Sequence, residues 1–299
     1  MKMNKVQYLD ILFRRPIRNH TLQNSIFDAI KDGSKVLDAG CGFGLLTLWA
    51  AQAGASQVVG VDMCDLSLAK ELAKENKLSE KTTFIQSNLQ SLDPNKIGTN
   101  FDVVLGLVYF NDPRRDEQQS KIISRIYENF LVDGGLRIPS RVEYTGYACE
   151  WSAQDIRTYY SNLKSELKAA EGYYNLSFNA VFNDTIKPPL ISWFPERELS
   201  GALKRSDARI LSEETLFTTI DYTESFEGYP KDMNFKISSP GVFTTVIWAQ
   251  KLYYKNVVIF YNESVSWIGE PIRVNKDDEV KIMIDDYWRT TNILQTEKS

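Results

Sequence analysis

Short apolar runs alternate with amphipathic segments through the first 130 residues of the chain. Four of the runs have the length and composition of buried strands, at residues 35–38, 58–62, 83–86 and 101–107. Apolar residues recur at helical spacing in segments 45–53, 66–76 and 117–130, and also in residues 1–30, where Pro16 interrupts them. Strands that alternate with helices predict a parallel sheet covered by helices, which binds ligands at the carboxyl ends of its strands.

The pattern changes after the sequence Asp133-Gly-Gly135. Residues 141–150, 243–252 and 257–261 are rich in β-branched and aromatic side chains and are separated by turn-forming residues, which predicts a mainly antiparallel sheet. Segment 153–171 instead has apolar residues at spacings of three and four and predicts a helix. We therefore expect two domains, residues 1–137 and 138–299, with a helical arm at about 153–171 in the second.

The junction between the first strand and the next helix carries the most specific motif. Residues 35–44 read Lys-Val-Leu-Asp-Ala-Gly-Cys-Gly-Phe-Gly, so glycines at 40, 42 and 44 follow the strand that ends on Asp38. Glycines at such a turn let a nucleotide-like ligand lie against the backbone. Asp62 ends the next strand, and an acid about 20 residues after the loop can accept hydrogen bonds from both hydroxyls of a ribose. Gly44 comes one residue too early for the dinucleotide fingerprint Gly-x-Gly-x-x-Gly.

Composition and charge exclude several classes of protein. A net charge of −4 over 299 residues provides no basic field for holding nucleic acid. No run approaches the roughly 18 apolar residues of a membrane-spanning helix. Three cysteines and one histidine argue against a disulfide framework and a structural zinc site. We expect a cytoplasmic protein with no bound metal and no nucleic-acid or membrane partner.

Asp38, the three glycines and Asp62 together resemble the cofactor loop of the S-adenosylmethionine-dependent methyltransferases. Further stretches resemble one branch of them, the protein arginine methyltransferases: Arg18 with Asn24-Ser-Ile-Phe27, Val59-Gly-Val-Asp-Met63, Leu131-Val-Asp-Gly-Gly-Leu-Arg-Ile-Pro139 and Gly172-Tyr-Tyr-Asn-Leu-Ser-Phe178. The resemblance implies an α/β fold: a Rossmann-like methyltransferase domain with a parallel-rich sheet, followed by a mainly antiparallel β-barrel-like domain with a helical arm. It also implies S-adenosylmethionine as cofactor, S-adenosylhomocysteine as product, and a homodimer.

The resemblance also implies which residues bind the cofactor. Arg18 matches the arginine that grips the cofactor's carboxylate, and Asp62 matches the acid that holds the ribose. The other matching positions are Asp38, Gly40, Gly42 and Gly44 around the methionine end, Met63 beside Asp62, and Asn88, Leu89 and Gln90 near the adenine.

The segment after the fourth strand departs from the family. In the family a hairpin here carries two glutamates that orient the substrate's guanidinium. The first falls on Leu107 or Val108, which cannot bind a cation, and the second falls on Asp116 or Glu117. A guanidinium buried against an apolar wall and a single carboxylate is undercompensated, so arginine methylation is not the expected reaction.

The residues that could serve an altered acceptor are Tyr109, Asn111, Asp112 and Glu117. They offer an aromatic wall, an amide and carboxylates, which could hold a neutral amine, amide or hydroxyl. Each also has a purely structural interpretation. Asn111-Asp-Pro113 is a common start of a turn, and Glu117 suits the first turn of an exposed helix.

Methyl transfer from a sulfonium is an in-line displacement, to which the enzyme contributes chiefly by positioning the nucleophile. The loss of one glutamate therefore removes cation selection and leaves methyl transfer feasible. We expect a methyltransferase that modifies a nitrogen, oxygen or carbon of a small molecule, a natural-product intermediate or a modified peptide. Two alternatives stand beside it: a catalytically inactive paralogue that acts as a regulatory or structural partner through segment 153–171, and atypical arginine methylation that uses Asp112.

Overall fold

The computed structural model describes residues 16–109, 113–151, 208–224, 226–284 and 290–295, together with a few positions between 165 and 177. Most of the predicted helical arm, and the part of the N-terminal helical region before Pro16, lie outside the described residues. Among the described residues, no helix is both long enough and apolar enough to cross a membrane.

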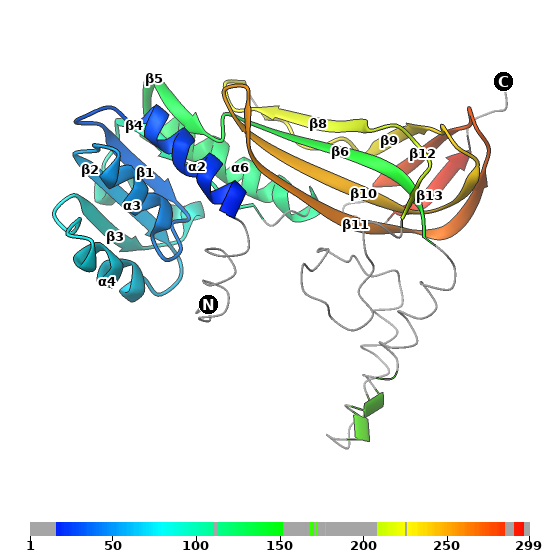
Figure 1. Ribbon diagram of the computed structural model, residues 1–299, viewed down its shortest axis with the longest axis horizontal. Coiled ribbons are helices and arrows are strands. Elements are labelled where there is room, and N and C mark those ends of the chain that lie inside the picture. The colour runs from blue at the N-terminus through cyan, green and yellow to red at the C-terminus, as the bar shows by residue number, and fades with distance from the viewer. Residues whose placement is uncertain are drawn as a thin grey trace.

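A five-stranded parallel sheet forms the first half of the chain (Figure 1). In sheet order its strands are β3 (Thr82–Gln86), β2 (Gln57–Asp62), β1 (Lys35–Ala39), β4 (Phe101–Leu105) and β5 (Leu131–Ile138). The four predicted strands are therefore confirmed. The edge strand β5 was not predicted, because Asp133-Gly-Gly135 interrupts its apolar run and most of its residues are only partly buried.

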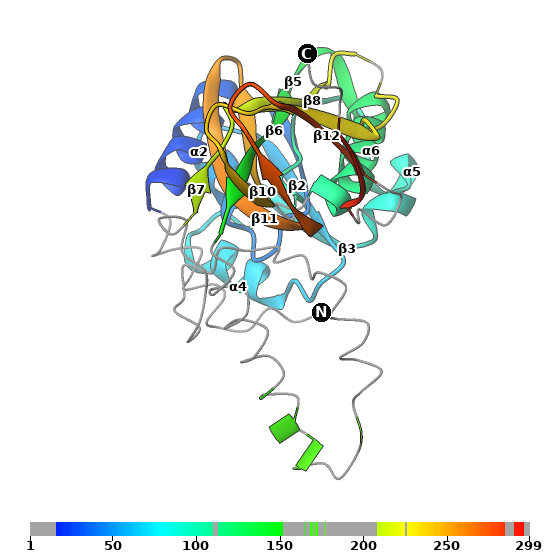
Figure 2. The same cartoon turned by 90° about the vertical axis from the view of Figure 1, so that its right-hand side faces the viewer.

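Helices cover both faces of this sheet. α2 (Pro16–Ala29) contacts α3 (Leu45–Gln52) on one face, and α6 (Pro113–Phe130) lies on the opposite face (Figure 2). The remaining helical elements are α4 (Ser67–Glu75), η1 (Leu89–Ser91) and α5 (Pro94–Ile97). α6 begins four residues before the predicted start, at a proline, whose fixed φ suits the first turn of a helix.

The second half of the chain forms curved antiparallel sheets, as predicted. The larger sheet has the order β11 (Val257–Val274), β10 (Gly241–Tyr254), β6 (Arg141–Glu150) and β7 (Arg209–Ile210), and β8 (Thr215–Asp221) also pairs with β6. The smaller sheet joins β13 (Thr290–Gln295), β12 (Glu279–Ile284) and β9 (Asp232–Lys236). The long strands curl together at the right of Figure 1 and form the barrel-like part of the fold.

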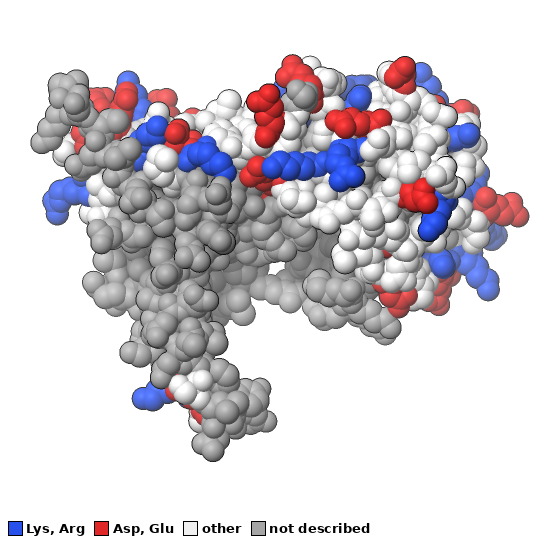
Figure 3. Space-filling view, turned by 180° about the vertical axis from the view of Figure 1, so that it is seen from behind, with Lys and Arg blue, Asp and Glu red and all other residues white. Residues whose placement is uncertain are grey.

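The two sheet systems share one hydrophobic core, which includes Leu105 of β4 and Val246 of β10. α6 contributes to this junction, where Tyr127 donates a 2.9 Å hydrogen bond to the carbonyl oxygen of Pro139. α2 packs against β11 from the other side. On the face shown in Figure 3, acidic and basic side chains are interspersed. The shared core brings the carboxyl end of β4 close to the barrel. The segments that follow β1 and β4 form the candidate site.

Candidate active site

The loop between β1 and α3 has a left-handed backbone at each of the three glycines of the motif. The φ angles of Gly40, Gly42 and Gly44 are +89°, +55° and +87°, values that L side chains rarely adopt. The loop is tied to β2 because the N–H groups of Gly40 and Cys41 both donate to the carbonyl oxygen of Val61, at 2.7 and 3.0 Å. The motif therefore specifies one particular backbone path.

The three glycines differ in what surrounds them. A Cβ at Gly40 would lie 2.1 Å from Cγ1 of Val108, and a Cβ at Gly44 would lie 3.1 Å from Ala69 and Phe84. At Gly42 no described neighbour lies within 4 Å of that position. Gly40 and Gly44 thus permit close packing within the protein, whereas the backbone at Gly42 is accessible to a ligand.

Asp62 links the end of β2 to this accessible backbone. Its Oδ2 accepts a 2.9 Å hydrogen bond from the N–H of Gly42, and its Oδ1 accepts a 2.9 Å hydrogen bond from the N–H of Cys64. Each carboxylate oxygen has a second lone pair, so the partly exposed Asp62 can still accept hydrogen bonds from a diol. The accepting carboxylate of Asp62 and the accessible backbone of Gly42 fit the ribose and backbone-facing parts of S-adenosylmethionine.

Asp38 lies inside the protein, next to the loop, and is only 1% exposed. Its Oδ2 accepts a 2.6 Å hydrogen bond from the hydroxyl of Thr47 in α3. Burial raises the pKa of Asp38 to about 7; the charge of Asp62 adds to the effect and the Thr47 hydrogen bond opposes it. The side chain of Asp38 therefore acts on the loop by joining β1 to α3.

Two residues that support the loop were missed from the sequence, Thr47 and Gly60. A Cβ at Gly60 in β2 would lie 2.9 Å from Oγ1 of Thr47 and 3.1 Å from Sγ of Cys41, so this glycine makes room for the loop. Thr47 carried a usable signal, because it is a polar residue within the apolar helix Leu-Leu-Thr-Leu-Trp-Ala-Ala. Gly60 had none beyond its place in a strand, where glycine is disfavoured.

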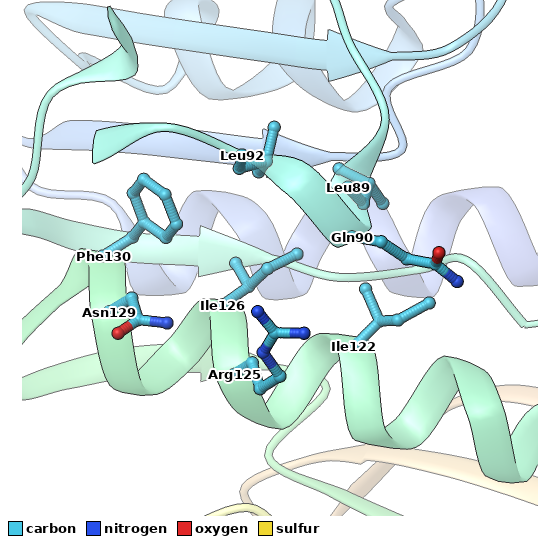
Figure 4. A pocket seen from close by; sticks show the side chains of 8 residues that line it. All are labelled: Leu89, Gln90, Leu92, Ile122, Arg125, Ile126, Asn129 and Phe130. Carbon is cyan, nitrogen blue, oxygen red and sulfur yellow. The ribbon is translucent and has the colours of Figure 1, made fainter. Parts of the chain in front are cut away.

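The predicted adenine-side residues lie after β3. The side chain of Asn88 accepts a 2.9 Å hydrogen bond from the N–H of Gln90 and begins η1. Leu89 and Gln90 point toward α6 and line a small pocket (Figure 4) with Leu92, Ile122, Arg125, Ile126, Asn129 and Phe130. Cδ1 of Leu89 also lies 3.9 Å from the Cβ position of Gly40, so this residue borders the loop as well.

Met63, which follows Asp62, is 67% exposed. An exposed apolar side chain beside the ribose position could cover the flat face of a ligand. Arg18 lies in α2, but the structure describes only its backbone, and Asn111 and Asp112 lie outside the described residues. The roles of these four residues remain predictions.

The chain leaves β4 through an apolar wall. Leu107 and Val108 are partly buried, and Val108 packs directly against Gly40. The next residue, Tyr109, reaches the barrel, where its hydroxyl shares a hydrogen bond with the hydroxyl of Tyr222. Burial raises the pKa of Tyr109, so the phenol stays protonated.

The structure separates the two candidates for the second glutamate position. Oε1 of Glu117 lies 2.9 Å from Nζ of Lys121, one turn later in α6, and the Glu117 side chain is 20% exposed. Asp116 is fully buried and accepts hydrogen bonds from the hydroxyl of Tyr144 at 2.7 Å and from Nε2 of Gln250 at 2.8 Å. Asp116 is therefore engaged by two donors from the barrel, whereas Glu117 is paired with a lysine of its own helix.

Comparison with known proteins agrees with this geometry. A family model described as a methyltransferase domain matches residues 36–135. Protein arginine N-methyltransferase 1 of Saccharomyces cerevisiae is 35% identical over 127 residues, which cover 42% of this chain and 34% of the yeast protein. The protein of the same name from Chlamydomonas reinhardtii is 24% identical over 273 residues, which cover 85% of this chain and 75% of the algal protein. The match thus spans about a third of the yeast relative and three quarters of the algal one.

Two solved structures share the fold over nearly the whole chain. The Trypanosoma brucei PRMT1 enzyme–prozyme heterotetrameric complex with AdoHcy matches with a TM-score of 0.67 and 15% identity, covering 93% of this chain and 86% of that one. Protein arginine methyltransferase 10 of Arabidopsis thaliana matches with a TM-score of 0.63 and 16% identity, covering 93% and 87%. The chain therefore carries an S-adenosylmethionine-dependent methyltransferase domain, and over nearly its whole length it shares the two-part fold of these arginine methyltransferase structures.

Proposed function

We propose that the chain transfers the methyl group of S-adenosylmethionine to an uncharged nucleophile of a small molecule or natural-product intermediate. The observation that carries the proposal is the hydrogen bond between Asp62 and the N–H of Gly42, at the one glycine of the loop whose backbone faces open space. When bound, the cofactor supplies a methyl group on a positively charged sulfur. The protein holds the acceptor in line with that group and excludes water.

The apolar wall supports an uncharged acceptor. Leu107 and Val108 stand where the resemblance places the first glutamate, and Val108 lies against the glycine loop. A cation buried against these side chains would lose its hydration without gaining a partner. A neutral amine, hydroxyl or activated carbon loses much less, and its methylation on nitrogen, oxygen or carbon fits the same position.

Calorimetric titration with S-adenosylhomocysteine tests the cofactor part of the proposal. We expect saturable binding by the unaltered protein and at least tenfold weaker binding by Asp62→Asn, since a hydrogen bond to a charged group contributes about 1.5–3 kcal/mol. Glu71→Gln, an exposed acid on α4, is the control and should bind as the unaltered protein does. The proposal fails if the unaltered protein does not bind S-adenosylhomocysteine.

A second candidate function is that of a catalytically inactive partner of an active methyltransferase. It is favoured by the loss of the first glutamate, and the Trypanosoma brucei structure is, by its description, an enzyme–prozyme complex. Under this reading the chain binds S-adenosylhomocysteine but turns over no acceptor alone, and it copurifies with a second methyltransferase. Turnover of a screened small nucleophile by the isolated chain would instead establish the first candidate.

Arginine methylation is the third candidate, because both relatives described above are named protein arginine methyltransferases. It would require Asp112 to replace the lost glutamate. Transfer of a radiolabelled methyl group to an arginine peptide, abolished in Asp112→Asn, would establish it.

For assembly we propose a cytoplasmic homodimer that pairs through segment 153–171. Light scattering of the unaltered chain and of a variant with Leu163 and Leu167 changed to glutamate tests the dimer, which should become a monomer in the variant.

A further inference from the structure

The barrel presents two convergent donors to Asp116. Tyr144 in β6 and Gln250 in β10 are directly paired across the antiparallel sheet. The Tyr144 hydroxyl and Nε2 of Gln250 donate to the same carboxylate oxygen, at 2.7 and 2.8 Å, and they also contact one another. All three residues are no more than 2% exposed. The sheet thus provides a pair of adjacent hydrogen-bond donors for a carboxylate from α6.

Further buried polar and aromatic side chains lie near this carboxylate. One turn after Asp116, the hydroxyl of Ser120 lies 3.3 Å from that of Tyr229. The ring of Tyr229 lies 5.6 Å from that of Tyr144, measured between centroids. Both Ser120 and Tyr229 are buried. The cluster is therefore part of the packed junction between α6 and the barrel.

A buried carboxylate is stable only if it is well hydrogen-bonded. Asp116 lies in the first turn of α6, where the helix dipole favours a negative charge, and it has the two donors from the barrel. The arrangement is mutually dependent. Without Asp116 the two donors lose their acceptor, and without the donors the buried carboxylate loses two hydrogen bonds.

We propose that Asp116 is a positioning residue that fastens the start of α6 to the barrel, and that this use of the carboxylate leaves the acceptor pocket selective for uncharged substrates. Tyr109 provides a second attachment to the barrel through Tyr222, so both sides of segment 110–115 are anchored. The statement about substrates rests on the proposed function. The attachment of α6 to the barrel through Asp116 does not depend on the proposed function.

Thermal unfolding of a set of shape-conserving variants tests the fastening. Tyr144→Phe with Gln250→Met removes both donors and should lower the Tm strongly, because the buried carboxylate loses these two hydrogen bonds. Adding Asp116→Leu to that pair should raise the Tm again, since it removes the buried charge whose two barrel donors have been lost. Glu128→Leu, an exposed acid on the same helix, is the matched control and should not raise it. A further fall in Tm on adding Asp116→Leu would overturn the proposal.

Binding of two peptides tests the consequence for specificity. The peptides carry arginine or its uncharged analogue citrulline, and binding is measured by fluorescence anisotropy with saturating S-adenosylhomocysteine. Tighter binding of the citrulline peptide supports the selectivity for uncharged substrates, whereas equal affinities, or no binding of either peptide, contradict it. A tenfold or greater preference for arginine that is lost in Asp116→Asn would overturn it. If S-adenosylhomocysteine does not bind, the proposed function fails, and the unfolding comparison still decides the role of Asp116.

Discussion

The hydroxyl of Thr47 donates a 2.6 Å hydrogen bond to the buried carboxylate of Asp38. This bond joins the first turn of α3 to the end of β1, on either side of the glycine loop. The glycine at position 60 leaves the room in which Thr47 and Cys41 pack. The conformation of the loop therefore depends on a buried polar pair as well as on its own glycines.

Thr47→Val should destabilise the protein by about 1–3 kcal/mol, because it removes the hydroxyl while keeping the shape and leaves Asp38 without this donor. Urea unfolding measures the loss. Thr83→Val, at an exposed position of β3, is the control and should change the midpoint little. Equal midpoints for both variants would show that the Thr47 bond contributes nothing to stability.

The raised pKa of Asp38 predicts a pH dependence of stability. The folded protein holds a proton on Asp38 up to about pH 7, whereas the unfolded chain loses it near 3.8. The associated stability is therefore fully present below about pH 3.8 and is lost as the pH rises through 7. Its size is on the order of 4 kcal/mol.

Asp38→Asn should flatten this dependence, since the amide is uncharged and its oxygen can still accept from Thr47. The free energy of unfolding of the variant and the unaltered protein should then differ more at pH 8 than at pH 5. Parallel stability curves over this range would contradict the assignment.

Gly42→Ala and Gly40→Ala should separate ligand binding from folding. At Gly42 the added methyl group meets no described neighbour, so only the left-handed backbone opposes it, at about 1–2 kcal/mol. We expect a modest fall in Tm but a large loss of affinity for S-adenosylhomocysteine. At Gly40 the methyl group would also overlap Val108, so the fall in Tm should be larger.

Val108→Ala provides the check on this difference. Because it removes the overlapping Cγ1 atom, it should recover part of the Tm lost in Gly40→Ala and none of that lost in Gly42→Ala. Equal recovery in both backgrounds would mean that the overlap does not explain the difference.

The ion pair between Lys255 and Asp28 should contribute little, although it joins α2 to the hairpin between β10 and β11. Its two side chains are 61% and 57% exposed, so water and salt screen their 2.7 Å contact. Lys255→Ala should leave the urea midpoint within error at physiological salt. A clear loss of stability would show that this surface contact holds the two halves together.

Strands that are buried at nearly every position were predicted from their apolar runs, and β3 was predicted as well, although most of its residues are exposed or partly buried. β1 and β2 are buried at nearly every position, so their short apolar runs were visible. β11 extends to Val274, well beyond the predicted end at Tyr261, because polar residues such as Asn262 and Glu263 interrupt its pattern. Pairing with β10 continues through them, since backbone hydrogen bonds do not depend on side-chain polarity.

The order of strands and helices in the first domain, and the glycine loop with its acid at 62, could be predicted from local patterns in the chain. These features depend on local periodicity and on backbone angles that few residues other than glycine adopt. The different surroundings of Asp116 and Glu117 could not be predicted in this way, because they depend on the folded arrangement. Successive residues of a helix point about 100° apart, which turned one acid to the barrel and left the other beside Lys121. The donors that hold Asp116, Tyr144 and Gln250, are 28 and 134 residues away along the chain, beyond the reach of any local pattern.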